Sequence, residues 1–276
     1  MKKIFLILLS VSIVSLSCSS DDDSTPIDPS NFATATVNYN GPSSVAENAG
    51  SVDVDISLSK PSAANTSFTI TQVGGTAEEG VDYTLTNVPV ASFTTSGVLT
   101  VNVINSPFPK PDRTLLLEVS TPEFGAELLN SSSNVPYSIS LTITDVNPTD
   151  GLTVGYDWNE DQASDLDLTV FYEDGTEVAI LATADVPEIG PSLILNTDPD
   201  GTYYIDMQPY DFSELQIDYN FGIAKPNGEV VELTGTFDFT NIGNYETDES
   251  GALGATAYRL VKVVKSGSNY TITSLN

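Results

Sequence analysis

Carboxylates crowd into one short, turn-like segment of the chain, GGTAEEGVDYTL at residues 74–85. Its glycines and its Asp82–Tyr83 pair stand between two stretches of strand-like sequence. Carboxylate oxygens are the ligands that calcium prefers, and the ion takes about six to eight oxygens drawn from several loops. The segment is therefore either the tip of a hairpin or one part of a calcium site whose other ligands come from elsewhere in the chain.

A second set of acids occupies DWNEDQASDLDLTVF, residues 157–171, which we interpret as one loop followed by the start of a strand. Side chains two residues apart on a strand point the same way, so Asp165 and Asp167 share one face while the neighbouring leucines point to the core. Carboxylates placed in this way repel each other unless a cation or a donor lies between them. The segment predicts either a calcium site, made by Asp157, Asp161, Asp165 and Asp167, or a solvated sheet edge.

The absence of histidine excludes whole classes of catalytic site. Neither a Ser-His-Asp nor a Cys-His nucleophile arrangement can form, and most catalytic zinc sites are excluded with them. The net charge of -29 repels nucleic acid and anionic lipid, so we expect no nucleic-acid partner. Paired carboxylates could still hydrolyse glycosides, but close pairs arise by chance among 38 acidic residues. We expect a protein that is not an enzyme, with calcium as the first ligand to test.

The N-terminus has the pattern of an export signal. Two lysines, an apolar run over residues 4–16 and small residues precede Cys18, the only cysteine of the chain. The run is too short to span a membrane, and a single cysteine forms no internal disulfide. A cysteine directly after such a run resembles the bacterial lipobox, in which the sulfur receives a lipid, although Ser15 stands where leucine is usual. The alternative is ordinary signal cleavage with an incidental cysteine.

Residues 18–31 are small, acidic and broken by proline, so they cannot build a core and are typical of a flexible tether. Cysteine followed by Ser19, Ser20 and three aspartates also resembles the export signal of surface lipoproteins in the Bacteroidetes group. The resemblance implies a protein of the bacterial outer membrane that is lipid-anchored through Cys18 and exposed at the cell surface. A solvated linker is the alternative.

Strands must position all of these acids. From residue 33 onward the chain alternates with period two, in short runs rich in Val, Ile, Thr and Phe that Gly, Pro, Asn and Ser interrupt. The pattern predicts an all-β chain of two β-sandwich domains. We expect a signal peptide over 1–17, the tether over 18–31, a first sandwich over 32–146, a linker over 147–150, and a second, more acidic sandwich over 151–276.

Glycine-containing turns punctuate the second domain. EDGT at residue 173, KPNGE at 225 and KSGSN at 265 predict tight hairpins. NTDPDGTYY at 196–204 begins like a calcium-binding EF-hand loop, but Met207 stands where a bidentate glutamate belongs, so we interpret this segment as a hairpin turn as well.

Three segments together resemble a Calx-beta domain across roughly residues 35–147: SVAENAGSVDVDISLSKP, GGTAEEGVDYTL and ISLTITDVNP. The resemblance implies an immunoglobulin-like sandwich in which carboxylates from several loops converge at one end. The positions that match its calcium ligands are Glu47, Asp82 and Asp145.

The chain departs from that family where its calcium-binding members carry a further run of acids. Here the run is mostly uncharged, Lys110 stands within it, and only Asp112 remains acidic. Fewer ligands and an added positive charge weaken a calcium site. The resemblance therefore implies that Glu47, Asp82, Asp145 and Asp112 bind calcium weakly or not at all. The alternative is that Asp82 caps its own turn while Glu47 and Asp145 are solvated.

These features favour a surface-anchored, non-enzymatic lipoprotein that binds or adheres to an extracellular protein or glycan. The alternative is a glycan-binding or carboxylate-pair glycan-hydrolysing surface protein. An exposed row of aromatic rings beside two facing acids would favour that alternative. The aromatic residues that would form such a row are Trp158, Tyr203, Tyr204 and Tyr210.

Overall fold

The computed structural model describes residues 31–121, 129, 132–158, 165–182, 187–211, 216–238 and 258–275. Within these ranges the chain forms strands joined by turns and short 3-10 segments, with no α-helix, which confirms the all-β prediction. None of the described segments is a helix long and apolar enough to cross a membrane. The signal peptide, Cys18, most of the tether and Asp161 lie outside the described residues.

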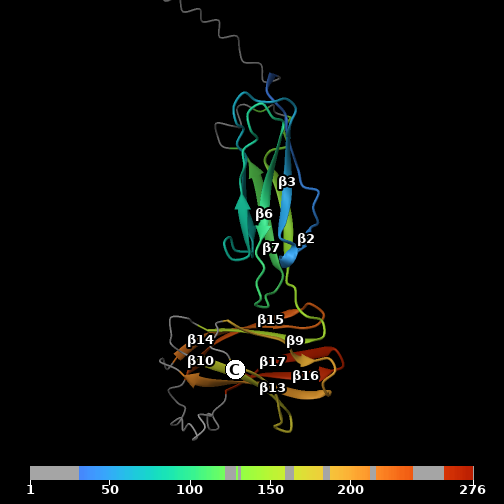
Figure 1. Cartoon of the computed structure of the whole chain (residues 1–276), viewed down its shortest axis with the longest axis vertical. Coiled ribbons are helices and arrows are strands. Elements are labelled where there is room, and N and C mark those ends of the chain that lie inside the picture. The colour runs from blue at the N-terminus through green and yellow to red at the C-terminus, as the bar shows by residue number, and fades with distance from the viewer. Residues whose placement is uncertain are drawn as a thin grey trace, which may run out of the picture.

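The first sandwich, as far as it is described, has two four-stranded sheets (Figure 1). One sheet has the order β1-β3-β6-β5, with β1 (Ala35–Asn38), β3 (Ser51–Leu58), β6 (Ser96–Val103) and β5 (Tyr83–Thr86). The other has the order β2-β8-β7-β4, with β2 (Ser44–Ala46), β8 (Tyr137–Thr144), β7 (Arg113–Ser120) and β4 (Thr69–Gly75). Neighbouring strands are antiparallel except β2 and β8, which are parallel. This order matches the ABED and CFG sheets of an immunoglobulin domain, with β2 added at one edge.

Alternation along each strand builds the core of this sandwich. In β7, for example, Leu115, Leu117 and Val119 point inward and are buried, while the residues between them face outward. Tyr83 of β5 is fully buried in the same core. The sequence did not predict β2 or β5, because strands of three and four residues carry too few alternations to be recognised.

The second sandwich, in its described part, packs a five-stranded sheet on a four-stranded sheet. The first has the order β11-β10-β13-β16-β17, with β11 (Glu177–Leu181), β10 (Asp165–Tyr172), β13 (Gly201–Asp211), β16 (Tyr258–Ser266) and β17 (Asn269–Ser274). The second has the order β12-β9-β14-β15, with β12 (Glu188–Leu195), β9 (Gly151–Trp158), β14 (Gln216–Ala224) and β15 (Val230–Asp238). The buried side chains of the two sandwiches form two separate core clusters.

The three predicted hairpins of the second domain are confirmed. They join β10 to β11, β14 to β15, and β16 to β17. Gly175, Gly228 and Gly267 adopt φ values of 86°, 86° and 60°, which are accessible to glycine at little cost. The prediction of a hairpin at residues 196–204 is wrong, because β12 and β13 belong to different sheets and the turn crosses between them.

One end of the first sandwich lies against the four-stranded sheet of the second. In Figure 1 the strands of the first run along the long axis of the molecule, and those of the second run across it. The β6–β7 loop, residues 104–112, descends from the first sandwich onto the four-stranded sheet of the second, where Phe108 and Pro109 touch Gly155 and Gly222. The chain passes between the sandwiches once, after β8 ends at Thr144.

Candidate functional site

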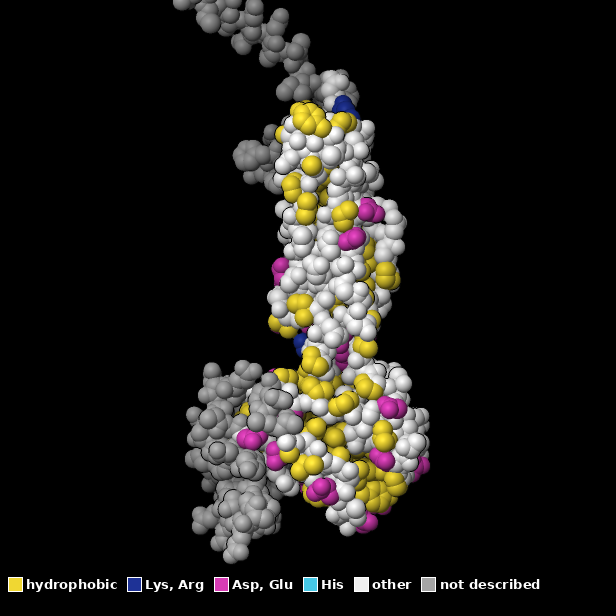
Figure 2. Space-filling view, viewed as in Figure 1, with side chains coloured by type: hydrophobic (Ala, Val, Ile, Leu, Met, Phe, Trp, Pro, Cys, Tyr) yellow, Lys and Arg dark blue, Asp and Glu magenta, His cyan; other side chains and the backbone are white. Residues whose placement is uncertain are grey.

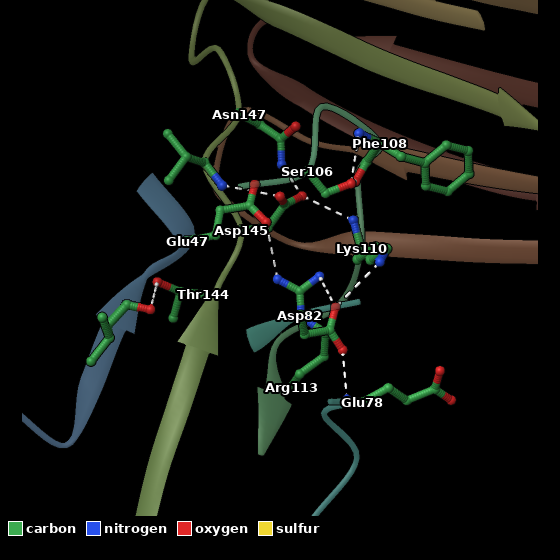
Figure 3. Close-up of polar contacts among 12 residues, drawn as sticks. Glu47, Glu78, Asp82, Ser106, Phe108, Lys110, Arg113, Thr144, Asp145 and Asn147 are labelled. Atoms are coloured by element: carbon green, nitrogen blue, oxygen red, sulfur yellow. Dashed lines mark hydrogen bonds and ion pairs between the residues drawn. The ribbon is translucent and has the colours of Figure 1, made fainter. Parts of the chain in front are cut away.

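Carboxylates from separate elements meet at the end of the first sandwich that faces the second (Figure 3). Glu47 begins the 3-10 turn η2 (Glu47–Ala49) directly after β2, Asp82 precedes β5, and Asp145 follows β8. Glu47 and Asp82 are only 1% and 5% exposed, and Asp145 is half-buried. The structure therefore brings together the three residues that the Calx-beta resemblance assigned, and Glu47 is not solvated.

The segment 74–85 is an arch between the two sheets and not a hairpin tip, because β4 and β5 belong to different sheets. Asp82 closes the arch: its Oδ2 accepts a hydrogen bond from the backbone N of Glu78 at 2.9 Å, and its own backbone N donates to the Glu78 carbonyl at 2.9 Å. The Tyr83 hydroxyl donates to Gln72 Oε1 at 2.7 Å and ties the arch to β4. Asp82 thus caps its own turn and also presents Oδ1 to the cluster.

A guanidinium lies among the carboxylates. Arg113, the first residue of β7, is 7% exposed. Its Nη2 donates to Glu47 Oε2 at 3.1 Å, and its Nη1 lies 3.6 Å from Asp82 Oδ1. Burying a carboxylate is costly unless a partner of opposite charge compensates it. Arg113 supplies that compensation to two buried carboxylates at once.

Lys110 is the second basic residue that contacts these carboxylates. Its Nζ donates to Asp82 Oδ1 at 3.2 Å, and its backbone N donates to Asp145 Oδ2 at 3.0 Å. Asp145 Oδ1 accepts a further hydrogen bond from the backbone N of Val146 at 3.1 Å. Each carboxylate of the cluster is therefore held by donors that belong to the chain itself.

The environment of Glu47 favours its protonated form. Burial, together with the hydrogen bond and negative charge of neighbouring Asp145, raises the pKa of Glu47 to about 7, while Arg113 acts in the opposite direction. The cluster therefore holds more negative charge than its basic side chains balance, and a proton on Glu47 relieves part of the excess.

A calcium ion does not fit this arrangement. Calcium needs several carboxylate oxygens converging on one point, whereas Arg113 and Lys110 engage the oxygens of Glu47 and Asp82 directly. Asp112, the fourth assigned residue, is exposed beside a cleft of about 480 Å³. Within the described ranges, no group of three or more Asp, Glu, Cys or His side chains is placed to hold a metal ion.

The acids predicted to share one loop in the second domain lie on two different sheets. Asp157 is part of β9 in the four-stranded sheet, whereas Asp165 and Asp167 are part of β10 in the five-stranded sheet. The prediction of a single loop is wrong because β9, which is buried along nearly its whole length, lacks the alternation that marks a strand. Asp161 falls outside the described residues.

Asp165 and Asp167 do share one face of β10, as predicted, because Leu166 and Leu168 point into the core. Burial raises the pKa of Asp167 to about 6, and the charge of Asp165 adds to that effect. Both effects favour the protonated form of Asp167.

Of the aromatic residues considered as a sugar platform, the three whose side chains are described do not form an exposed row. Trp158 and Tyr203 are 3% and 1% exposed and belong to the core of the second sandwich. Tyr204 faces the other side of β13, and the Arg259 guanidinium lies 3.9 Å from the centre of its ring. The side chain of Tyr210 lies outside the described residues.

The sequence reasoning missed Arg113, although its position carries a signal. Arg113, Leu115, Leu117 and Val119 alternate along β7 and share the inward face. An arginine in phase with three buried apolar residues is itself expected to be buried, and a buried arginine needs an acidic partner. That argument would have located the cation of the cluster.

The sequence matches no protein-family model and no curated protein. Among solved structures, the apo form of the Calx CBD1 domain is 18% identical, with 41% of this chain covering 99% of that domain at a TM-score of 0.32. The calcium binding domain CBD12 of CALX1.1 is 13% identical. The match covers 68% of this chain and 79% of that one, at a TM-score of 0.32. A two-domain protein of unknown function from Bacteroides fragilis is 7% identical. The match covers 75% of this chain and 94% of that one, at a TM-score of 0.34. At these values the likenesses concern the β-sandwich fold alone.

Proposed function

We propose that this chain is a lipid-anchored, non-enzymatic surface protein in which the first sandwich is a spacer and the second is the module that binds or adheres. One observation carries the proposal: the chain enters the first sandwich at the end opposite to the second sandwich (Figure 1). An anchored tether at that end holds the second sandwich outward, away from the membrane.

The strand register supports this placement. Ala35 at the start of β1 pairs with Leu58 at the far end of β3, whereas β3 begins at Ser51, next to η2 and the carboxylate cluster. The seven intervals between eight extended residues span roughly 23 Å at about 3.3 Å each. The tether and the joint with the second sandwich are therefore separated by the full length of the first.

The surface and chemistry of the chain suit binding better than catalysis. Acidic side chains are scattered over the visible face of the second sandwich (Figure 2), and the net charge of -29 keeps such a surface soluble and unattractive to nucleic acid. The chain has no histidine, and Arg113 and Lys110 engage the carboxylates of Glu47 and Asp82. The classes of partner to test are therefore extracellular proteins and glycans.

Anchoring is tested by Cys18→Ala in the producing bacterium. Lipid chains would be the membrane contact of this chain, so the variant is expected in the soluble fraction, while a control with Ser30→Ala, a tether position outside the export segment, stays with the membranes. Protease added to intact cells should remove the second sandwich from the control strain. A Cys18→Ala protein that still sediments with membranes would contradict the anchoring.

Binding is tested on the two-domain chain with a glycan array and an array of extracellular proteins, each with calcium and with chelator. Retention of one ligand class by the whole chain, lost when residues 151–276 are removed, is the expected result. Cleavage of a glycan during the assay would show instead that the chain is a hydrolase.

A further inference from the structure

Two residues of the first sandwich are buried against the second. Phe108 and Pro109 lie in the β6–β7 loop, and Phe108 is only 6% exposed, yet it belongs to neither core cluster. In Figure 3 its ring points away from the carboxylates. Its neighbours are Gly155 of β9 and Gly222 of β14, which lie directly opposite each other in register. We name Phe108 and Pro109 the wedge, and the two glycines the glycine pair.

The contact requires glycine at both positions. A Cβ added at Gly222 would lie 2.0 Å from the carbonyl oxygen of Pro109, and one at Gly155 would lie 2.5 Å from Pro109 Cδ. Neither glycine has a positive φ, so backbone conformation does not demand glycine here. The close approach of the other domain does.

The carboxylate cluster binds the residues that follow the wedge in the chain. Lys110 directly follows Pro109, and its backbone and side chain are bound by Asp145 and Asp82. Three residues later, Arg113 begins β7 and is bound by Glu47. On the other side, Ser106 Oγ accepts a hydrogen bond from the backbone N of Phe108 at 3.2 Å. The loop is therefore fixed on both sides of its wedge.

We propose that Arg113 and Lys110 are the built-in cations of a joint between the two sandwiches. Their positive charges draw the carboxylates of three elements together, and this holds the wedge on the glycine pair and sets the angle between the domains. The joint needs no divalent cation, because two basic side chains occupy the places where a metal would bind. This inference concerns how the two sandwiches are oriented and stands apart from the anchoring of the chain.

Distances between spin labels test the joint in the two-domain chain of residues 19–276. This chain lacks Cys18 and so has no native cysteine. Cysteines introduced at exposed positions, Asp55→Cys in β3 and Thr234→Cys in β15, place one label on each domain. Pulsed electron paramagnetic resonance should give one narrow distance distribution, the same in about 10 mM calcium and in chelator. A distribution that narrows or shifts when calcium is added would overturn the proposal.

Gly222→Ala tests the wedge itself. The new methyl group displaces Pro109, so the distance distribution should broaden while each sandwich keeps its own circular dichroism and melt. Gly74→Ala is the matched control: Gly74 also lies in a strand without a positive φ, but its Cβ would meet only Leu116 at 3.7 Å. A Gly222→Ala distribution as narrow as that of the control would show that the wedge does not fix the domains.

Arg113→Gln tests the role of the cation. The variant loses the charge that holds Glu47 and Asp82. The distribution of distances between the two spin labels should therefore broaden, with both sandwiches still folded. Lys110→Gln provides the same test if the Arg113 variant fails to fold, because Lys110 is more exposed than Arg113. Unchanged distributions in the folded variants would overturn the assignment of built-in cations.

Discussion

At the scale of single residues, the choice of an arginine at position 113 sets the chemistry of the cluster. A guanidinium is planar and carries several donors in a fixed fork, so it can engage two carboxylates at once. Arg113 does so with Glu47 and Asp82. A charge held in this way remains in place whatever the calcium concentration.

Removing the basic side chains should change the response to calcium. Breaking a buried ion pair costs about 3 kcal/mol or more, so Arg113→Gln should lower the melting temperature of the first sandwich by roughly ten degrees. Arg113→Gln combined with Lys110→Gln leaves Glu47, Asp82 and Asp145 without a cation. At dissociation constants of about 10⁻⁴ to 10⁻³ M, about 10 mM calcium should then restore roughly 1.4 to 2.7 kcal/mol.

Calorimetry with calcium and with chelator measures both effects, and the unsubstituted chain should melt identically in the two conditions. A calcium-dependent rise of several degrees in the unsubstituted chain, lost in Asp82→Asn, would show a weak calcium site instead.

The raised pKa of Glu47 predicts a pH dependence of stability. Its folded value of about 7 lies above the ordinary value of 4.5, so the folded state holds the proton more tightly than the unfolded state. The stability that this adds is fully present below the unfolded pKa, and it is lost as the pH rises toward 7.

Urea unfolding of the unsubstituted chain and of Glu47→Gln, at several pH values between about 4 and 8, isolates the effect. The unsubstituted chain should lose stability relative to the variant as the pH rises. A difference that does not vary with pH would contradict the assignment to Glu47.

At the scale of elements, the arch between β4 and β5 shows how backbone geometry delivers Asp82 to the cluster. Gly75 and Gly80 adopt φ values of 106° and 88° on either side of the two glutamates. Both conformations disfavour L side chains, but the space around the two residues differs. A Cβ at Gly75 would lie 2.2 Å from the Thr114 carbonyl oxygen, whereas a Cβ at Gly80 would meet nothing within 4 Å.

Substituting these two glycines should therefore have unequal effects. Gly80→Ala adds only backbone strain, about 1 to 2 kcal/mol. Gly75→Ala adds a clash with β7 to that strain and should cost more than about 3 kcal/mol. Chemical unfolding of the two variants measures the difference, and equal losses would mean that the packing of Gly75 against Thr114 is not a constraint.

At the scale of the whole molecule, the two sandwiches have separate cores joined by one chain passage and one wedge. The described core of the second sandwich contains only residues from Leu152 onward, and that of the first contains none beyond Ile143. Each core, as far as it is described, therefore consists of residues from one sandwich alone.

A fragment of residues 150–276 should accordingly be soluble and unfold in one cooperative transition. Trp158, the only tryptophan, is buried in its core, so fluorescence reports the transition directly. An unfolded fragment would mean that the sandwiches form one folding unit and that the boundary at 147–150 is misplaced.

The sequence by itself determined the all-β class, the three hairpins of the second domain and the set Glu47, Asp82 and Asp145. These depend on local signals, namely alternation along a strand, glycines that permit positive φ, and short stretches that resemble a known family. Strand β9 was missed because six consecutive residues are buried, which removes the alternation.

Only the tertiary structure decided what the carboxylates hold. Arg113 and Glu47 are 66 positions apart in the chain, and the wedge and the glycine pair come from different domains. Charge compensation and close backbone contact depend on distance in space, which no local pattern encodes. Three carboxylates that a sequence motif assigns to a metal can therefore be assembled around an arginine and a lysine of the same chain.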